Sequence, residues 1–326
     1  MGEKIGRLVG FNKYKGMKKY CVYTVIVGGF DDVKQPLVID DRFDYILFSD
    51  TCKESHVGIW QVYKLSRELF KEKETRRLNF LLSRYPKLCT HKFLDDYESS
   101  LYVDGNIQIT SQYVYDKCVD MSNRGIEWGY IKHQYIDCVY WEMQGIVGVA
   151  WAHDYDIYEW YKFLRSENYP EHIGLFENNI IFRKHTGLVA KIEEMWWWGV
   201  LNYAPRDQFT LMYAIWKHPQ VKTELILTDT ENAWHNNGHF LYSDHKPHKR
   251  VLKRTPLELT RMRCWRIAHP NEPYLHIIDM GLKHRYPRLF IHLWTFYAIF
   301  RYGYKVLQEM INVRLHKTPK NENTVA

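Results

Sequence analysis

Short apolar runs that end in polar loops recur along the first hundred residues. The runs are YCVYTVIV (20–27), DYILFSD (44–50), GIWQVYKL (58–65) and SLYV (100–103). Runs of this length, rich in β-branched and aromatic residues, are typical of strands buried on both faces of a sheet. The charged segment 72–88 lies between them and predicts a helix. Strands separated by helical segments predict an α/β fold with a mainly parallel central sheet, which binds ligands at its carboxyl edge.

Polar residues follow three of these runs, at the edge where ligands are expected. Asp104-Gly105-Asn106 comes directly after SLYV, Asp31 follows the first run, and Asp50 ends the second. A turn is the commoner role of such residues, because Asp and Asn bond to nearby backbone groups and Gly accepts positive φ. Oxygen ligands can also hold a metal ion against a nucleotide diphosphate. Both roles stay open for Asp104 and Asn106, and Asp31 and Asp50 are equally candidates for nucleoside contacts.

Composition narrows the class of protein. The chain has 326 residues, of which 46% are hydrophobic and 25% charged, as in a folded globular protein. Aromatic residues make up 16%, which suits sites that stack on sugars or bases and also suits membrane interfaces. The six cysteines form no C-x-x-C pair, so a zinc knuckle or dense disulfide framework is not indicated and a reducing cytosol is expected. Neither a G-x-G-x-x-G nor a P-loop motif is present.

Positive charge is concentrated near the C-terminus. Residues 246–317 contain 15 Lys and Arg against four acids, a net charge of +11, whereas residues 1–245 carry −4. Within 284–317 an apolar, aromatic run of about a dozen residues is shorter than the roughly twenty needed to span a bilayer. This basic helical extension is predicted to lie on an anionic membrane surface, and a helix packed on the domain is the alternative. We see no secretory signal or N-terminal anchor in residues 1–19.

Several segments, taken together and in order, resemble a known family. They are YTVIVGGFDD, DYILFSD, RYPKLCTHKFLDDYESSLYVDGN, IKHQYIDCVYWE, LFENNIIFRK and APRDQFTLMYA. They are similar to the glycosyltransferase-like family of bacteria and plants that includes mucilage-related proteins and capsule-cluster enzymes. The resemblance covers about residues 20–216. It implies a GT-A-like fold with a single nucleotide-sugar-binding domain, 20–245, between a basic lead-in at 1–19 and the C-terminal region 246–326.

The resemblance also implies a metal site. Asp104 and Asn106 stand where GT-A enzymes carry two acids that bind Mn²⁺ or Mg²⁺ against the diphosphate of the donor. The neutral Asn106 is a weaker ligand for a hard cation than a carboxylate. A further metal ligand comes from a C-terminal histidine in some of these enzymes, which makes His239 in HNNGHFLYSDH a candidate, although histidines in a polar loop are more often solvated.

Other residues are assigned by role. Arg84 and Lys87 would face an anionic donor if their helix lies at the sheet edge, and a solvated helix face is the alternative. His91 is a weaker candidate for the same role. Asp207 opens a predicted helix, where a carboxylate either stabilises the helix or acts as the general base toward an acceptor hydroxyl. Glu177 is the rival for the base, and the sequence does not give the stereochemistry of transfer.

These observations predict a glycosyltransferase. It would move a sugar from a nucleotide-sugar donor to a glycan or lipid-linked acceptor, in bacterial surface polysaccharide synthesis, on the cytoplasmic face of the membrane. One alternative is a non-catalytic relative that binds nucleotide sugars or glycans, since a fold does not fix the chemistry. The other is a nucleic-acid-binding protein that uses the basic C-terminal region. We expect the enzyme, and we expect no nucleic-acid partner.

Overall fold

The computed structural model describes residues 18–148, 154–203, 206–228 and 237–245, together with helical residues between 293 and 308. The chain divides into two compact units. The first comprises Met1–Val139 and Glu167–Lys249, and the second comprises Tyr140–Ser166 and Arg250–Ala326. The domain boundaries expected from the sequence stay predictions. Most of the expected helical region 284–317 lies outside the described residues, as does the lead-in up to residue 17.

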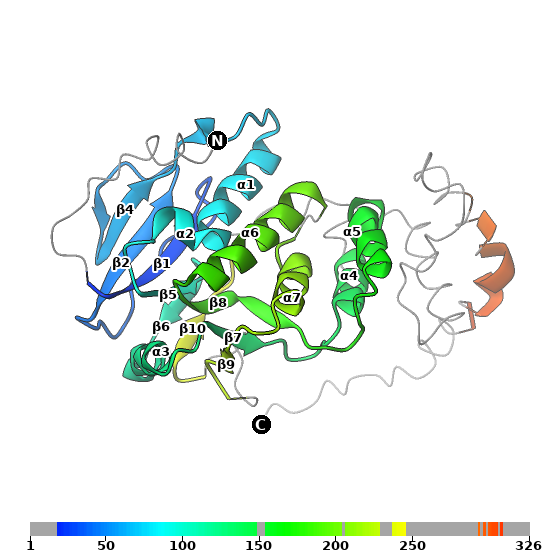
Figure 1. Ribbon diagram of the computed structural model, residues 1–326. Helices are drawn as coiled ribbons and strands as arrows, with labels where there is room; N and C mark the ends of the chain where they lie inside the picture. The colour runs from blue at the N-terminus through cyan, green and yellow to red at the C-terminus, as the bar shows by residue number, and fades with distance from the viewer. Residues whose placement is uncertain are drawn as a thin grey trace, which may run out of the picture. The chain divides into compact units, whose positions relative to one another are not determined.

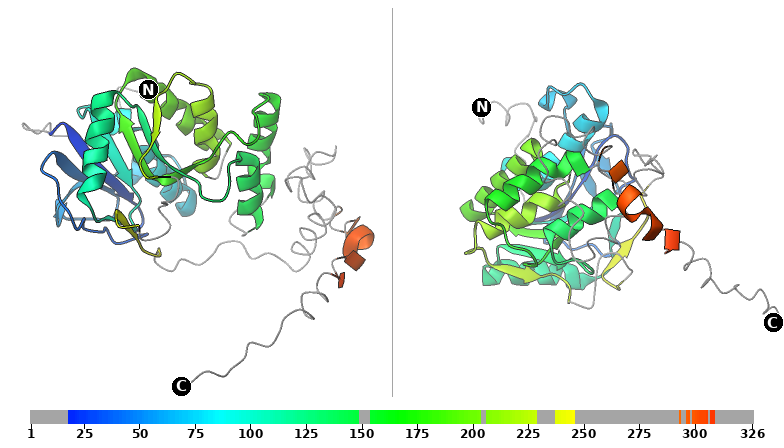
Figure 2. Two further views of the ribbon diagram at one scale, coloured as in Figure 1. Left: turned by 90° about the horizontal axis from the view of Figure 1, so that it is seen from below. Right: turned by 90° about the vertical axis from the view of Figure 1, so that its right-hand side faces the viewer.

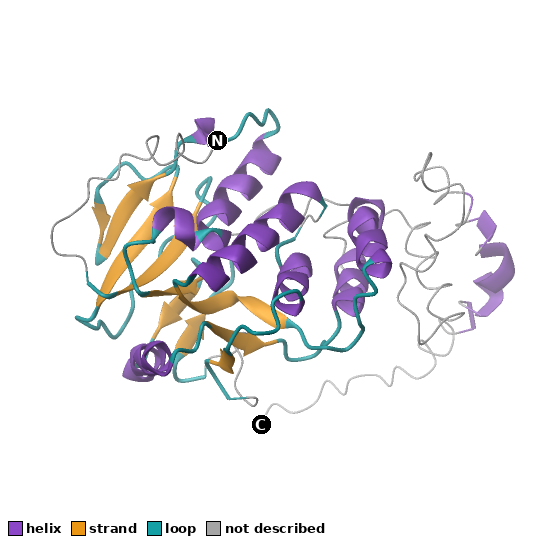
Figure 3. Cartoon of the chain, viewed as in Figure 1, coloured by secondary structure: helices purple, strands orange, loops and turns teal. Residues whose placement is uncertain are grey.

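The first unit is built on a mixed, mainly parallel sheet (Figures 1 and 3). The order of its eight strands is β3-β4-β2-β1-β5-β8-β7-β9, with four parallel and three antiparallel pairings. The predicted α/β fold with a mainly parallel sheet is therefore confirmed. The strands are β1 (Tyr20–Ile26), β2 (Phe43–Ser49), β3 (His56–Val57), β4 (Trp60–Lys64), β5 (Ser99–Val103), β7 (Trp128–Lys132), β8 (Phe176–Lys184) and β9 (Thr223–Leu225).

The four strands predicted from apolar runs correspond to β1, β2, β4 and β5. Every residue of β1 and β5 is buried, because these central strands have neighbours on both sides and helices over both faces. The predicted helix at 72–88 is α1 (Thr75–Leu88). The sequence therefore predicted the parallel half of the sheet correctly.

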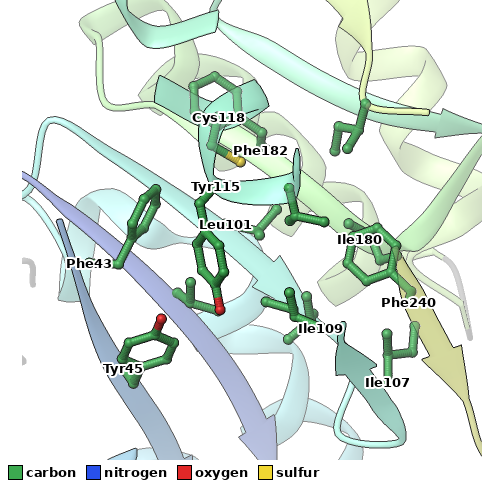
Figure 4. Close-up of a cluster of buried hydrophobic side chains, with 14 of the residues drawn as sticks. Phe43, Tyr45, Leu101, Ile107, Ile109, Tyr115, Cys118, Ile180, Phe182 and Phe240 are labelled. Atoms are coloured by element: carbon green, nitrogen blue, oxygen red, sulfur yellow. The ribbon is translucent and has the colours of Figure 1, made fainter. Parts of the chain in front are cut away.

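Helices cover both faces of the sheet (Figure 2). One face carries α1, α2 (Thr90–Phe93), α6 (Gly187–Asn202) and α7 (Gln208–Trp216), with α1 contacting β1 and α7 contacting β8. The other face carries α3 (Gln112–Arg124). Tyr115 and Cys118 of α3 are buried against Phe43, Leu101 and Phe182 of the strands (Figure 4). The sheet is thus enclosed, and its carboxyl edge remains as the place for a site.

A second, two-stranded sheet extends this edge. β6 (Ile107–Ile109) follows β5 after a tight turn and pairs antiparallel with β10 (Phe240–Tyr242). Its register places Tyr242 opposite Ile107 and Phe240 opposite Ile109. The chain after β10 therefore runs back toward the turn between β5 and β6.

The second unit contains α5 (Asp154–Ser166) and all but the first residue of α4 (Val139–Gly148). Arg165 lies over the ring of Tyr140 at 4.2 Å, and Tyr140 makes an edge contact with Tyr161 at a centroid distance of 5.8 Å. These contacts join α4 to α5. Across the described residues of both units, none of the helices combines the length and the apolar character needed to traverse a bilayer.

Candidate active site

The turn Asp104-Gly105-Asn106 connects β5 to β6 at the carboxyl edge of the sheet. The Asp104 N–H donates to the carbonyl of Asn179 on β8 at 2.8 Å, and the Ile107 N–H donates to the Asp104 carbonyl at 2.9 Å. A Cβ atom on Gly105 would lie only 2.8 Å from the side chain of Ile26 in β1, so a larger residue would force that side chain to shift. The apolar strand therefore stops on this turn because the backbone passes close to β1, and Asp104 takes the predicted position at the strand end.

The carboxylate of Asp104 is partly exposed and lies among donors. Its Oδ1 accepts a hydrogen bond from the Tyr102 hydroxyl at 2.5 Å and lies 3.4 Å from the ammonium of Lys87. The side chain of Asp104 is 29% exposed, whereas that of Lys87 is 4% exposed. The Lys87 ammonium also lies 4.7 Å from the centre of the Tyr102 ring. The carboxylate of Asp104 is thus partly open to solvent, while the lysine beside it is buried.

Lys87 connects Asp104 to Asp207. Its ammonium forms a 3.0 Å ion pair with Asp207 Oδ2, and Arg84 Nε lies 3.4 Å from Asp207 Oδ1. Arg84 and Lys87 are three residues apart on α1, so they share one face of that helix. Through these contacts the shared face of α1 meets the end of β5, and a role of Arg84 and Lys87 toward an anionic donor stays a prediction. We call Asp104, Lys87, Asp207, Arg84 and Tyr102 the Asp104 cluster.

Asp207 is the most buried carboxylate of the cluster. Burial raises its pKa, but the charges of Lys87 and Arg84 outweigh burial and hold the pKa well below its usual range. Asp207 precedes α7 as its N-cap residue, yet its side chain makes no capping hydrogen bond. The Asp207 carboxylate therefore forms ion pairs with Lys87 and Arg84 instead of capping α7. Its depressed pKa keeps it ionised.

Glu177 and His133 form a second buried pair near the cluster. His133 Nε2 lies 3.4 Å from Glu177 Oε1, and the two side chains are 11% and 5% exposed. The charges of Asp104 and Glu177 both act on the hydroxyl of Tyr242. Burial raises the pKa of Tyr242, and the negative charges of Asp104 and Glu177 raise it further.

Asp31 and Asp50 end their strands differently. Asp31 lies beside the turn, 9% exposed, and pairs with His245 Nδ1 at 2.8 Å; this pairing raises the pKa of His245. The side chain of Asp50 is fully buried, accepts from the Gly28 N–H at 2.7 Å and pairs with Arg67 at 2.5 Å. Asp31 therefore belongs to the surroundings of the Asp104 cluster. The hydrogen bond from Gly28 to Asp50 stabilises the loop that follows β1.

His239 and His91 lie in other contacts. The ring of His239 stacks on Tyr113 at 4.3 Å and its Nδ1 bonds to Ser111 at 2.8 Å, at the end of the β6–β10 ladder that is remote from Asn106. His91 Nδ1 bonds to Glu193 of α6 at 2.6 Å. The structure does not bring either histidine to Asp104. The histidine that follows β10 toward the turn is His245.

Comparisons with known proteins identify the family. A family model described as "TOD1/MUCI70, glycosyltransferase-like domain" matches residues 12–236, which is more than two thirds of the chain. The chain belongs to this family. The expected enzyme class, a glycosyltransferase, is thereby confirmed. A comparison with curated protein sequences finds no match.

Solved structures with a similar fold are themselves glycosyltransferases. Mouse xyloside xylosyltransferase 1 is 8% identical with a TM-score of 0.38, over 63% of this chain and 84% of that one. Core-mannan synthase A from Aspergillus fumigatus, in a Mn/GDP form, is 9% identical with a TM-score of 0.38, over 67% and 75%. The galactosyltransferase LgtC, with donor and acceptor sugar analogues, is 10% identical with a TM-score of 0.37, over 63% and 72%. Likeness at this level carries no argument about residues.

The turn of this TOD1/MUCI70 family member has oxygen atoms suited to a divalent cation. Among the described residues, no hydrogen bond or ion pair reaches Asp104 Oδ2. Asn106 donates its amide N–H to the Ser243 carbonyl at 2.6 Å, which leaves its buried Oδ1 without a hydrogen-bond partner among the described residues. No group of three or more His, Cys, Asp or Glu side chains suited to a metal occurs in that part of the chain. A cation held here would take its remaining ligands from phosphate and water, as Mg²⁺ commonly does.

Some features of the site were not predicted from the sequence. Tyr102, His245 and His133 contact predicted residues but were not themselves assigned a role. His133 directly follows β7, a strand that the apolar runs did not predict, so the rule that flagged the strand-end acids did not reach it. A shallow pocket on α6 and α7 lies apart from the Asp104 cluster and is lined by Lys191, Glu194, Met195, Trp198, Tyr213 and His218.

Proposed function

We propose that the protein transfers a sugar from a nucleotide-sugar donor to a glycan or lipid-linked acceptor, with the Asp104 cluster at the donor diphosphate. The observation that carries the proposal is a partly exposed carboxylate at the carboxyl edge of β5, set beside Lys87 and Arg84. Ligands bind at this edge in open α/β sheets. Family membership supports sugar transfer as the chemistry.

A divalent cation, Mn²⁺ or Mg²⁺, fits the proposal. Asp104 Oδ2 and Asn106 Oδ1 would hold it against the two phosphates. A cation in this place stabilises the charge of the departing nucleoside diphosphate. Lys87 and Arg84 are already paired with Asp207, so their main contribution is to hold the carboxylates in place. Asp31 adds a further carboxylate beside the turn, within reach of the donor.

We propose Glu177 as the general base that takes the proton of the acceptor hydroxyl. Asp207 is the rival, but a carboxylate whose pKa is held well below its usual range by two cations is a weak base. The contacts of Asp207 support a positioning role for Lys87 and Arg84. With Glu177 as the base, the acceptor oxygen attacks the anomeric carbon directly from the side opposite the phosphate, so the product should have the opposite anomeric configuration from the donor. Proton NMR of the first product tests this.

The site of action proposed is the cytoplasmic face of a bacterial membrane, in surface polysaccharide synthesis of the capsule type. Arg301 and Lys305 are exposed, and Phe300 nearby is 92% exposed, which supports contact with an anionic lipid surface. Full-length protein should co-sediment with phosphatidylglycerol liposomes at low salt and should be released by high salt. The variant Arg301→Glu/Lys305→Glu should bind less, and equal binding of both proteins would count against this location.

A donor screen tests the function. Purified protein is incubated with UDP-, GDP-, ADP- and dTDP-sugars, with Mn²⁺ or Mg²⁺ and with excess EDTA, and nucleoside diphosphate release is measured. We expect one class of donor to be turned over only with metal. Asp104→Ala should abolish release, whereas Asp96→Ala, a change to an exposed acid before β5, should not. Binding of a donor without turnover would support the non-catalytic alternative.

A further inference from the structure

His133 lies at the carboxyl end of β7, next to the beginning of β8. Its backbone N–H donates to the carbonyl of Leu175 at 2.8 Å, which holds the residue beside the strand that carries Glu177. Between Tyr130 and Ile131 the pairing of β7 with β8 changes register, so that Tyr130 faces Ile181 and Ile131 faces Glu177. An irregularity of this kind re-aims side chains near active sites.

The hydrogen bonds of the imidazole fix its tautomer. His133 Nδ1 accepts from the backbone N–H groups of Tyr135 at 3.2 Å and Ile136 at 3.0 Å. A ring nitrogen that accepts in this way carries no proton, so the proton of the neutral ring lies on Nε2. Nε2 is the nitrogen 3.4 Å from Glu177 Oε1. The ring nitrogen that carries the proton is therefore the one that lies beside the carboxylate.

The surroundings keep this ring neutral. Burial lowers the pKa of His133, and the positive charge of Arg206 lowers it further. The N–H of a neutral imidazole can orient the Glu177 carboxylate and leave its negative charge available to accept a proton. A positively charged imidazolium would offset that negative charge. The groups that face the ring are Glu177 from β8, the charge of Arg206 before α7, and the two backbone amides of the loop after β7.

We propose that His133 is a positioning residue that aims Glu177 at the acceptor hydroxyl. This inference rests on the proposed function. In the transfer step Glu177 takes the hydroxyl proton while the acceptor oxygen forms its bond to the anomeric carbon. The bond from that carbon to the phosphate oxygen breaks, and its electron pair leaves with the nucleoside diphosphate. His133 keeps its Nε2 proton throughout, and the 3.4 Å contact shortens when the acceptor is bound.

Two variants separate positioning from structure. His133→Asn keeps an acceptor near the place of Nδ1 for the loop amides and removes the donor toward Glu177. His133→Gln supplies an N–H near the place of Nε2. With the donor found in the screen, we expect His133→Asn to lower kcat by roughly 10- to 100-fold, less than the loss of a base itself, with the donor KM within about twofold. His133→Gln should keep most of the activity.

The dependence of kcat/KM on pH distinguishes the two roles, because a merely structural role of His133 would leave its acid limb unchanged. A carboxylate that loses a donor is protonated more readily, so the acid limb of kcat/KM should move to higher pH in His133→Asn and stay near its wild-type position in His133→Gln. Wild-type rate and profile in His133→Asn would overturn the proposal. The proposal would also be overturned if His133→Asn and His133→Gln lost the same kcat while the acid limb stayed in place, with thermal melting showing that both variants are folded.

A spectroscopic test does not depend on turnover. In ¹⁵N-labelled full-length protein at pH 7, the His133 ring should show an unprotonated Nδ1 and a protonated Nε2, and Glu177→Gln should shift the Nε2 resonance. The proposed pairing of His133 with Glu177 would be overturned by a ring protonated on Nδ1, by an imidazolium, or by an Nε2 resonance that does not change in Glu177→Gln. If no nucleotide sugar is turned over, the proposed function fails, while this measurement still decides whether His133 and Glu177 are coupled.

Discussion

Replacing Lys87 with methionine removes the cation that connects the two carboxylates of the Asp104 cluster. Methionine has a similar length, so the change mainly removes charge. In the wild type the ammonium lies 3.0 Å from Asp207 Oδ2 and 3.4 Å from Asp104 Oδ1, and both Lys87 and Asp207 are buried. Removing one partner of a buried ion pair costs about 3–5 kcal/mol. Because Arg84 still pairs with Asp207 at 3.4 Å, we expect the lower end of that range.

The loss of stability in Lys87→Met should depend on pH. In the wild type the pKa of Asp207 is depressed, so its ionised form stabilises the fold above its unfolded pKa, and this contribution is lost only as pH falls through the folded pKa. Without Lys87, burial opposes only the charges of Arg84 and Arg206, so we expect the folded pKa of Asp207 to rise above its unfolded value and the ionised carboxylate to destabilise the fold at neutral pH. Lowering the pH toward 4.5 should therefore narrow the difference between variant and wild type.

Urea unfolding followed by tryptophan fluorescence measures this difference at pH 7 and pH 4.5. Lys73→Met, at an exposed lysine just before α1, is the matched control and should change stability by less than about 0.5 kcal/mol. The double variant Lys87→Met/Asp207→Asn should regain much of the lost stability, because the unpaired buried charge is gone. A loss in Lys87→Met no larger than the control, or one that is equal at both pH values, would refute the reasoning.

Three further outcomes are expected. Glu177→Gln should lower kcat at least about a hundredfold with the donor KM nearly unchanged, as steady-state kinetics would show, and a normal kcat would move the base role to another residue. Gly105→Ala should destabilise the protein by about 1–3 kcal/mol in urea titrations, because its Cβ would lie 2.8 Å from Ile26; an unchanged midpoint would mean that β1 yields freely. Glu193→Gln removes the negative charge that pairs with the fully buried Arg183 at 2.9 Å and should cost about 3–5 kcal/mol in the same assay, whereas a loss below about 1 kcal/mol would show that the remaining contacts of Arg183 suffice.

The parallel strands and the position of Asp104 follow from the sequence because both depend on local patterns. An apolar run of five to eight residues needs little context to form a buried strand, and the polar residues after it must lie at the sheet edge. Arg84 and Lys87 are three residues apart on a predicted helix, so their shared face was also predictable. What remained open was whether that face meets solvent or the site.

Other features depend on contacts between distant segments. The place of His239, at the far end of the small sheet from Asn106, follows from the register of β6 with β10, two strands more than 130 residues apart, and no local pattern sets that register. The sequence placed Asp207 at a helix start, where its charge suits the helix dipole, and gave no sign that α1 would bring Lys87 within 3.0 Å. His91 is polar and follows a predicted helix, yet it bonds to Glu193 because α2 lies against α6.

The most direct test of the account is metal-dependent release of nucleoside diphosphate from the preferred nucleotide sugar by the wild type and by Asp104→Asn. The asparagine keeps the size of the side chain and the turn, and it removes the negative charge with which Asp104 would bind the proposed cation beside the donor diphosphate. The account predicts turnover by the wild type that EDTA abolishes and excess Mn²⁺ or Mg²⁺ restores, and a loss of at least about a hundredfold in folded Asp104→Asn. Full activity of Asp104→Asn, or of the wild type in excess EDTA, would contradict it.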